Sequence, residues 1–258
     1  MFSIVIPTLK KNIKVLNMLL QQLVEDDCIA EIILIDNTTN GFEYSNEKVK
    51  VIVPKKNQYV NPAWNLGVLN SSCDYIGLVN DDLIFPKNFF VQILGYLEKN
   101  KNIGYMGLEP IDKTEENAFN DYPQERKLYF DFVDKRSLSF GSAMFFIKEN
   151  YYKIPEKLKV FCGDDFLFYK ALENGYKNVK ICNSGVLHLH ALTSSLKSFD
   201  KIKYNDQVLY SQMNPNYVFC DRDVFSFVER IFSISHSYDK KHIKICFLGL
   251  KIKFKRKF

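Results

Sequence analysis

The chain has 258 residues, of which 47% are hydrophobic and 25% charged, which is ordinary for a globular α/β domain with an appendage. The net charge of +5 is concentrated at the C-terminal end, so the rest is nearly balanced and a nucleic-acid-binding face is not indicated. The six cysteines form no C-x-x-C pair, which argues against a secreted disulfide framework.

The first half of the chain alternates predicted strands and helices. Short apolar runs that end at proline or at Asp-Asn turns are typical of strands buried on both faces, and they predict strands over 2–6, 31–35, 49–53 and 75–79. Helical spacing of apolar residues, or a proline at the first turn, predicts helices over 13–23, 62–70 and 86–97. This order predicts an α/β fold with a mostly parallel sheet flanked by helices.

The second half is less regular. Residues 110–127 are polar and charged and are expected to form a loop or lid, whereas 140–147, 179–181 and 185–189 have the composition of short strands. Two further helices are expected, one that starts at Asp164 and ends before Gly175 and one from Ser198. We expect a catalytic domain over 1–195, with a smaller acceptor-side sheet, and a helical and basic C-terminal extension over 196–258.

The C-terminal segments 240–245 and 251–258 interleave basic and apolar residues. Such a tail can lie on an anionic membrane surface, although a solvated edge strand with protective lysines has the same pattern. No segment approaches the about 20 apolar residues of a spanning helix, and the first residues lack the basic region of a signal peptide. We therefore expect a cytoplasmic protein, either free or peripheral at the inner face of the plasma membrane.

Polar residues follow three of the predicted strands: Pro7-Thr8, Asp36-Asn37 and Asn80-Asp81-Asp82. Ligands of open α/β sheets bind where the carboxyl ends of the strands meet. The three segments therefore predict one site at one edge of the sheet.

Two of the patterns are typical of metal ligands. Asn80 and Asp82 are separated by one residue on a tight turn and can face one Mg²⁺ or Mn²⁺ ion, although Asn and Asp are also common turn residues. His188 and His190 alternate on a predicted strand and so lie on one face. One imidazole would complete the ligand shell begun by Asp82, and the alternative is a structural histidine.

Carboxylates also occur where acid–base chemistry or base recognition would need them. Asp164 and Asp165 begin a predicted helix, where they either complement the helix dipole or supply a general base for an acceptor hydroxyl. A like-charged neighbour would raise the pKa of that base. Asp36 ends the second predicted strand and can accept a hydrogen bond from the imide N–H of uracil or thymine, unless it is only part of an Asp-Asn turn.

Taken in order, these segments resemble the family 2 glycosyltransferases with the GT-A fold. The resemblance extends over about residues 2–195 and is carried by 2–8, 31–37, 57–67, 75–82, 140–144, 163–176 and 186–188. Three positions depart from the family pattern. Asn80 stands at the first position of the D-x-D motif, Trp64 stands where arginine is common, and an Asp-Asp pair replaces Glu-Asp.

The resemblance implies an inverting transfer of a sugar from a nucleoside-diphosphate sugar, with UDP or dTDP as the nucleotide, to a hydroxyl of a glycan or lipid-linked acceptor in bacterial polysaccharide or lipooligosaccharide synthesis. It implies Asp165 as the base, Asp164 as an acceptor ligand, and Mn²⁺ or Mg²⁺ on Asp82 with His188, or with His190 in its place. The implied contacts to the nucleotide sugar are Pro7, Thr8, Asp36, Asn57, Asn65, Asn80 and Asp81.

Two other functions stay open. A sugar nucleotidyltransferase would have a glycine-rich phosphate loop after the first strand, and residues 7–10 contain no glycine. A catalytically degenerate homologue that binds a sugar or a partner enzyme is favoured by Asn80 in the metal motif.

Overall fold

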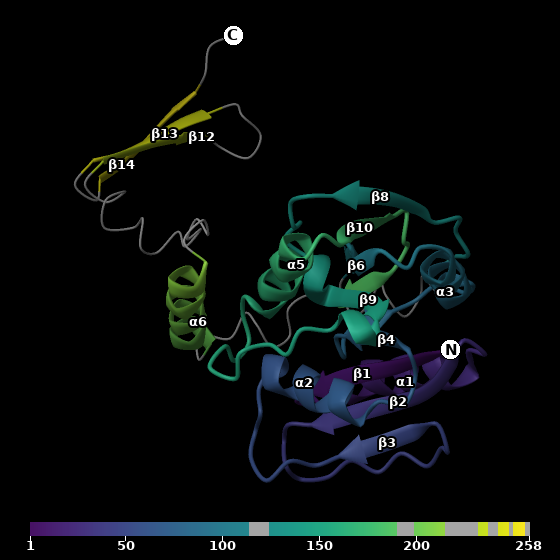
Figure 1. Ribbon diagram of the computed structural model, residues 1–258. Coiled ribbons are helices and arrows are strands. Elements are labelled where there is room, and N and C mark those ends of the chain that lie inside the picture. Colours follow the sequence, from purple (N-terminus) through teal and green to yellow (C-terminus); the bar gives the residue numbers. More distant parts are fainter. Residues whose placement is uncertain (114–123, 190–198, 215–231, 237–241, 248–249, 256–258) are drawn as a thin grey trace. The chain divides into compact units, whose positions relative to one another are not determined.

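The computed structural model describes residues 1–113, 124–189, 199–214, 232–236, 242–247 and 250–255 (Figure 1). The chain forms two compact units, Met1–Tyr210 and Ser211–Phe258. Among the described residues, none of the helices is both long and apolar enough to cross a membrane.

The first unit is built on an eight-stranded sheet with the order β3-β2-β1-β4-β9-β6-β10-β8. The pairs among β3, β2, β1 and β4 are parallel, as is the pair of β6 with β10, whereas β9 is inserted antiparallel between β4 and β6. The predicted mostly parallel sheet is therefore confirmed. The strands are β1 (Phe2–Thr8), β2 (Ile29–Asp36), β3 (Val49–Ile52), β4 (Tyr75–Val79), β6 (Ile103–Leu108), β8 (Tyr129–Val133), β9 (Ala143–Ile147) and β10 (Lys177–Cys182).

Helices cover both faces of this sheet, which explains why β1 is apolar and buried at almost every position. Phe2, Ile4 and Ile6 share a core cluster with residues of helices α1 (Ile13–Glu25) and α3 (Phe89–Lys99). Val5 lies on the other face, where it contacts helix α2 (Val60–Asn70) at Gly67. A side chain at that glycine would overlap Val5, so the absence of one lets α2 approach β1 closely.

A small second sheet brings late residues of the chain to the end of β4. It has the order β5-β11-β7, with β5 (Leu83–Ile84), β11 (Leu187–Leu189) and β7 (Ile111–Lys113). His188 on β11 pairs with Leu83 on one side and with Asp112 on the other. The segment 110–127 is predicted to be a loop or lid, but its beginning forms β7, which adds a parallel partner to β11. Residues 114–123 of that segment lie outside the described part of the chain.

Two more helices are α5 (Gly163–Glu173), in the first unit, and α6 (Asp200–Met213), which begins in the first unit and ends in the second, and both follow the predicted positions. The second unit contains a three-stranded antiparallel sheet of β12 (Phe232–His236), β13 (His242–Phe247) and β14 (Leu250–Lys255). In its register Lys244 pairs with Lys253 and Ile245 with Ile252, so basic and apolar positions alternate along the ladder.

Candidate active site

A cavity of about 330 Å³ lies at the carboxyl ends of β1, β2 and β4. All three strand ends that the sequence singled out contribute to it, and the second half of the chain supplies the opposite wall. The residues that line it include Pro7, Thr8, Asn37, Asn57, Tyr59, Trp64, Asn80, Asp81, Asp82, Ser139, Gly141, Ser142 and His188.

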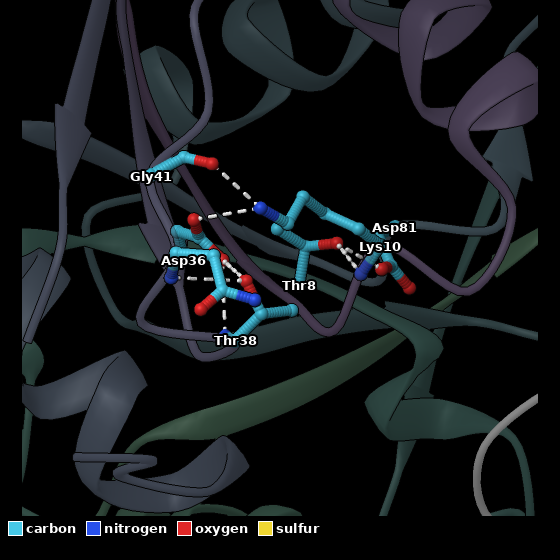
Figure 2. A network of polar contacts seen from close by, with 7 residues as sticks. Thr8, Lys10, Asp36, Thr38, Gly41 and Asp81 are labelled. Atoms are coloured by element: carbon cyan, nitrogen blue, oxygen red, sulfur yellow. Dashed lines mark hydrogen bonds and ion pairs between the residues drawn. The ribbon is translucent and has the colours of Figure 1, made fainter.

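A continuous network of hydrogen bonds joins the ends of the three strands (Figure 2). The Thr8 hydroxyl donates to Asp81 Oδ2 at 2.5 Å and accepts from the backbone N–H of Lys10 at 2.9 Å. Burial and the charge of Asp82 raise the pKa of Asp81 to about 6, although the bond from Thr8 acts in the opposite direction. Thr8 thus fixes Asp81 against the end of β1.

Asp36 is enclosed by the same network. Lys10 Nζ donates to Asp36 Oδ2 at 3.0 Å and to the carbonyl of Gly41 at 2.6 Å, and Thr38 donates twice to Asp36 Oδ1, from its N–H at 3.0 Å and its hydroxyl at 2.6 Å (Figure 2). Burial opposes ionisation of this carboxylate, but these donors outweigh it and lower the pKa of Asp36. The side chain of Asp36 is 0% exposed, so a nucleotide base reaches it only if a donor such as Lys10 moves.

Asp82 and His188 lie side by side in the cavity lining. His188 Nε2 lies 3.3 Å from Asp82 Oδ2, and His188 Nδ1 lies 3.1 Å from Asp112 Oδ1. Burial of the ring disfavours its protonated form, but the two carboxylates outweigh burial and raise the pKa of His188. The small sheet therefore places His188 beside Asp82.

The donor atoms at this point fit a divalent cation. Asp82 Oδ1 is buried and has no hydrogen-bond partner within the described part of the chain. A carboxylate oxygen beside an imidazole suits Mn²⁺ or Mg²⁺, with phosphate oxygens of a substrate to fill the remaining positions. The described residues contain no cluster of three or more such ligands, and His190 lies outside them.

The predicted catalytic pair lies next to the cavity wall and is bound to an arginine that the sequence reasoning missed. Arg136 contacts both oxygens of Asp165, with Nε at 2.5 Å from Oδ1 and a terminal nitrogen at 3.2 Å from Oδ2, and it contacts Asp164 Oδ2 at 2.9 Å. Burial and the charge of Asp164 raise the pKa of Asp165 to about 6, and Arg136 counteracts both. Arginine in an irregular loop gives no signal in the sequence that it pairs with a distant helix.

Gly141 lies between the cavity and Asp164. It lines the cavity, and a Cβ atom at this position would lie 2.5 Å from Asp164 Oδ2. The absence of a side chain therefore lets Asp164 approach the cavity wall closely.

The two predicted asparagine contacts have different surroundings. Asn57 lines the cavity and its side chain accepts from the N–H of Tyr59 at 2.7 Å. Asn65 is not among the residues that line the cavity, because it faces the segment after β9. Its amide donates to the Ile154 carbonyl at 2.8 Å and accepts from the Tyr151 hydroxyl at 2.7 Å and the Ile154 N–H at 2.9 Å.

Trp64 occupies the cavity wall where arginine is common in the family that the sequence resembles. Its side chain is almost fully buried, and its indole N–H has no acceptor within the described residues. A buried donor without an acceptor costs about 1–3 kcal/mol. Trp64 lines the cavity, so a ligand bound there would lie next to this indole.

The fold and this site define a glycosyltransferase of the GT-A type. The sequence model described as glycosyl transferase family 2 matches residues 3–174, and the chain belongs to that family. A search of curated protein sequences gives no match.

Solved structures of glycosyltransferases share the fold at low sequence identity. Residues 1–349 of TarS from S. aureus in complex with UDP match with a TM-score of 0.56 and 13% identity, over 88% of this chain and 74% of that one. GalNAc-T7 in complex with UDP, GalNAc and Mn²⁺ matches with a TM-score of 0.55 and 13% identity, over 88% of this chain and 54% of that one.

Gly141→Ala should lower sugar transfer strongly, because the added methyl group would displace Asp164. A misplacement of about 1 Å can cost roughly 100-fold in rate. Gly95→Ala is the matched control, since a Cβ there meets no atom within 4 Å. Steady-state transfer rates of both variants check this, and equal rates in the two would show that the position of Asp164 does not matter.

Proposed function

We propose that the chain is an inverting glycosyltransferase that moves a sugar from a nucleoside-diphosphate sugar, with UDP or dTDP as the nucleotide, to a hydroxyl of a glycan or lipid-linked acceptor. The observation that carries the proposal is Asp82 Oδ1, which lies beside His188 and has no hydrogen-bond partner among the described residues, in the same small cavity whose wall touches Asp164. The UDP in the TarS and GalNAc-T7 structures supports a nucleotide-sugar donor, and the surface-glycan setting follows the family resemblance.

The donor would occupy the cavity between the strand ends and Trp64. Pro7, Thr8, Asn57, Asn80 and Asp81 line it and would contact the nucleotide sugar, with Asp81 fixed by its bond from Thr8. The indole N–H of Trp64 would donate to a phosphate oxygen, in place of the arginine of related enzymes. That bond would satisfy a donor that has no acceptor in the part of the chain that the structure describes.

Asp82 and His188 would hold Mn²⁺ or Mg²⁺ on the phosphate side of the donor, a choice that the Mn²⁺ in the GalNAc-T7 structure supports. A divalent cation bound there would neutralise negative charge on the leaving diphosphate.

Asp165 would take the proton of the acceptor hydroxyl while the acceptor oxygen bonds to the anomeric carbon and the nucleoside diphosphate departs. Arg136 occupies one direction at each oxygen of Asp165, and each carboxylate oxygen has a second lone pair for a hydroxyl. The positive charge keeps this base ionised despite its burial. Asp164 would bind the acceptor and is held by the same arginine.

Nucleotide binding tests the function directly. UDP or dTDP with Mn²⁺ should raise the thermal unfolding midpoint, by an amount that corresponds to about 2.7 kcal/mol at a ligand concentration of 100 Kd. Asp82→Ala should remove the Mn²⁺-dependent part of the shift, and the exposed Asp27→Ala should retain it. If no nucleotide stabilises the protein with or without Mn²⁺, the donor assignment is wrong.

The pH profile of transfer tests the base. Asp165 must be ionised to accept a proton, so kcat/KM should rise with pH through about 6. Arg136→Gln removes the charge that lowers the pKa of Asp165, and it should move this limb to higher pH by about 1–3 units. The exposed neighbour variant Lys135→Gln should leave it in place. An unchanged pH profile in Arg136→Gln would show that Arg136 does not set the pKa of the catalytic base.

A catalytically degenerate homologue is the second candidate, because Asn80 in the metal motif offers no carboxylate. Turnover of a nucleotide sugar in the presence of Mn²⁺ separates it from an enzyme. Such a homologue would bind the nucleotide and leave it intact.

We also propose that the second unit attaches the protein to a membrane surface, which suits a lipid-linked acceptor. The support is the alternation of basic and apolar positions along β13 and β14. Changing Lys251, Lys253 and Lys255 together to Gln should weaken cosedimentation with anionic vesicles by roughly 100-fold, from about 1 kcal/mol per basic residue. Equal binding to neutral vesicles by the unchanged protein would contradict an electrostatic attachment.

A further inference from the structure

Tyr59 has a backbone conformation that is normally found only at glycine. At the start of α2 its φ is 64° and its ψ is −176°. A side chain is strained in this region, and residues persist there only when their surroundings impose it, commonly at functional sites. The strained backbone at Tyr59 therefore suggests that its side chain has a functional role.

Neighbouring asparagines hold this conformation in place. The Tyr59 N–H donates to Asn57 Oδ1 at 2.7 Å, and the Tyr59 carbonyl accepts from Asn37 Nδ2 at 3.3 Å and from the Ala63 N–H at 3.3 Å. A glycine would satisfy the same three bonds without strain. What tyrosine adds at this position is only its ring and hydroxyl.

The ring lies where a second hollow meets the active-site cavity. A groove of about 1070 Å³ runs along α2 and the segment 148–159, and it shares Asn57 and Tyr59 with the cavity. Lys159 Nζ lies 5.9 Å from the centre of the Tyr59 ring, so the ring faces this groove. A molecule that occupied both hollows would pass Tyr59.

The groove is positively charged. Four lysines line it against a single glutamate: Lys56, Lys148, Lys153 and Lys159, with Glu156. The glutamate is paired with Lys153 at 2.8 Å, and both of these side chains are about 70% exposed, so the pair is weak and easily exchanged. Lys148 and Lys159 donate to the backbone carbonyls of Ser71 and Glu156, which are neutral acceptors. The carboxylate of Glu156 also interacts with the charge of Lys159, so one glutamate faces four lysines and the lining keeps a net positive charge.

We propose that this groove binds the anionic part of a glycan acceptor, with Tyr59 as the platform on which a sugar ring stacks where the groove enters the active site. The inference rests on the proposed glycosyltransferase function. Lysines bind phosphate, sulfate or carboxylate groups as point charges, an aromatic ring supplies apolar contact with a polar tip, and the groove has about three times the volume of the cavity.

Binding of a heparin-derived tetrasaccharide, with neutral maltotetraose and UDP as references, tests the charge of the groove. Lys56→Gln/Lys153→Gln should weaken binding of the anionic tetrasaccharide about tenfold relative to UDP and reduce its dependence on salt. The matched control Lys87→Gln/Lys99→Gln, at exposed lysines outside both hollows, should leave it unchanged. Equal loss in both double variants, or tighter binding of anionic vesicles or a short RNA through the same lysines, would overturn the proposal.

Tyr59→Gly gives an independent test, because the structural and functional effects have opposite signs. Removing the strain should raise the thermal unfolding midpoint, while removing the ring should lower affinity for the tetrasaccharide about tenfold. Tyr59→Phe should retain most of the affinity. Unchanged affinity in Tyr59→Gly would overturn the role of the ring. If UDP itself fails to bind the unchanged protein, the proposed function fails, whereas a failure confined to the tetrasaccharide refutes only the groove.

Discussion

The geometry of the strand ends that border the cavity depends on the hydroxyl of Thr8 and on its neighbour Lys10. The Thr8 hydroxyl donates to Asp81 at the end of β4 and accepts from the N–H of Lys10, whose side chain in turn reaches Asp36 at the end of β2. A parallel sheet brings these ends to one edge, and the network fixes them there. Because Asp81 is held back against β1, the next residue, Asp82, is the carboxylate that meets His188.

The carboxylates at the strand ends and those at the start of α5 differ in their hydrogen-bond partners. At the strand ends, Asp36 and Asp81 accept hydrogen bonds from Lys10, Thr38 and Thr8, whereas one oxygen of Asp82 has no partner in the described chain. At the start of α5, a single guanidinium spans two adjacent carboxylates. Under the proposed function, the buried Asp82 Oδ1 favours binding of a cation that arrives with the substrate. The Asp164–Asp165 pair is compensated by Arg136, which favours proton transfer to Asp165 near neutral pH.

Much of the fold follows from local patterns in the sequence. Buried parallel strands are continuous apolar runs, and Asp, Asn and Pro end them, so β1, β2 and β4 and the polar residues after them could be predicted. The antiparallel insertion of β9 between β4 and β6 could not, because strand neighbours are chosen by long-range packing. The two-residue β5 is too short to produce a pattern of its own.

The same distinction applies to the site. Asp82 and His188 were predicted from residue type and position, and Asn57 from the family resemblance. The structure places all three at the cavity. Lys10 and Arg136 could not, since a basic residue in a loop is indistinguishable in sequence from a solvated one. The glycine-like backbone of Tyr59 is likewise imposed by distant Asn37 and could be recognised only from coordinates.

The most direct test of the central claim is the coupling between Mn²⁺ and UDP, measured by electron paramagnetic resonance of the free ion. If Asp82 and His188 hold a cation that also contacts the diphosphate, UDP should tighten Mn²⁺ binding to the protein, and His188→Ala should abolish this coupling. Mn²⁺ affinity that is the same with and without UDP, or that survives intact in His188→Ala, would contradict the account.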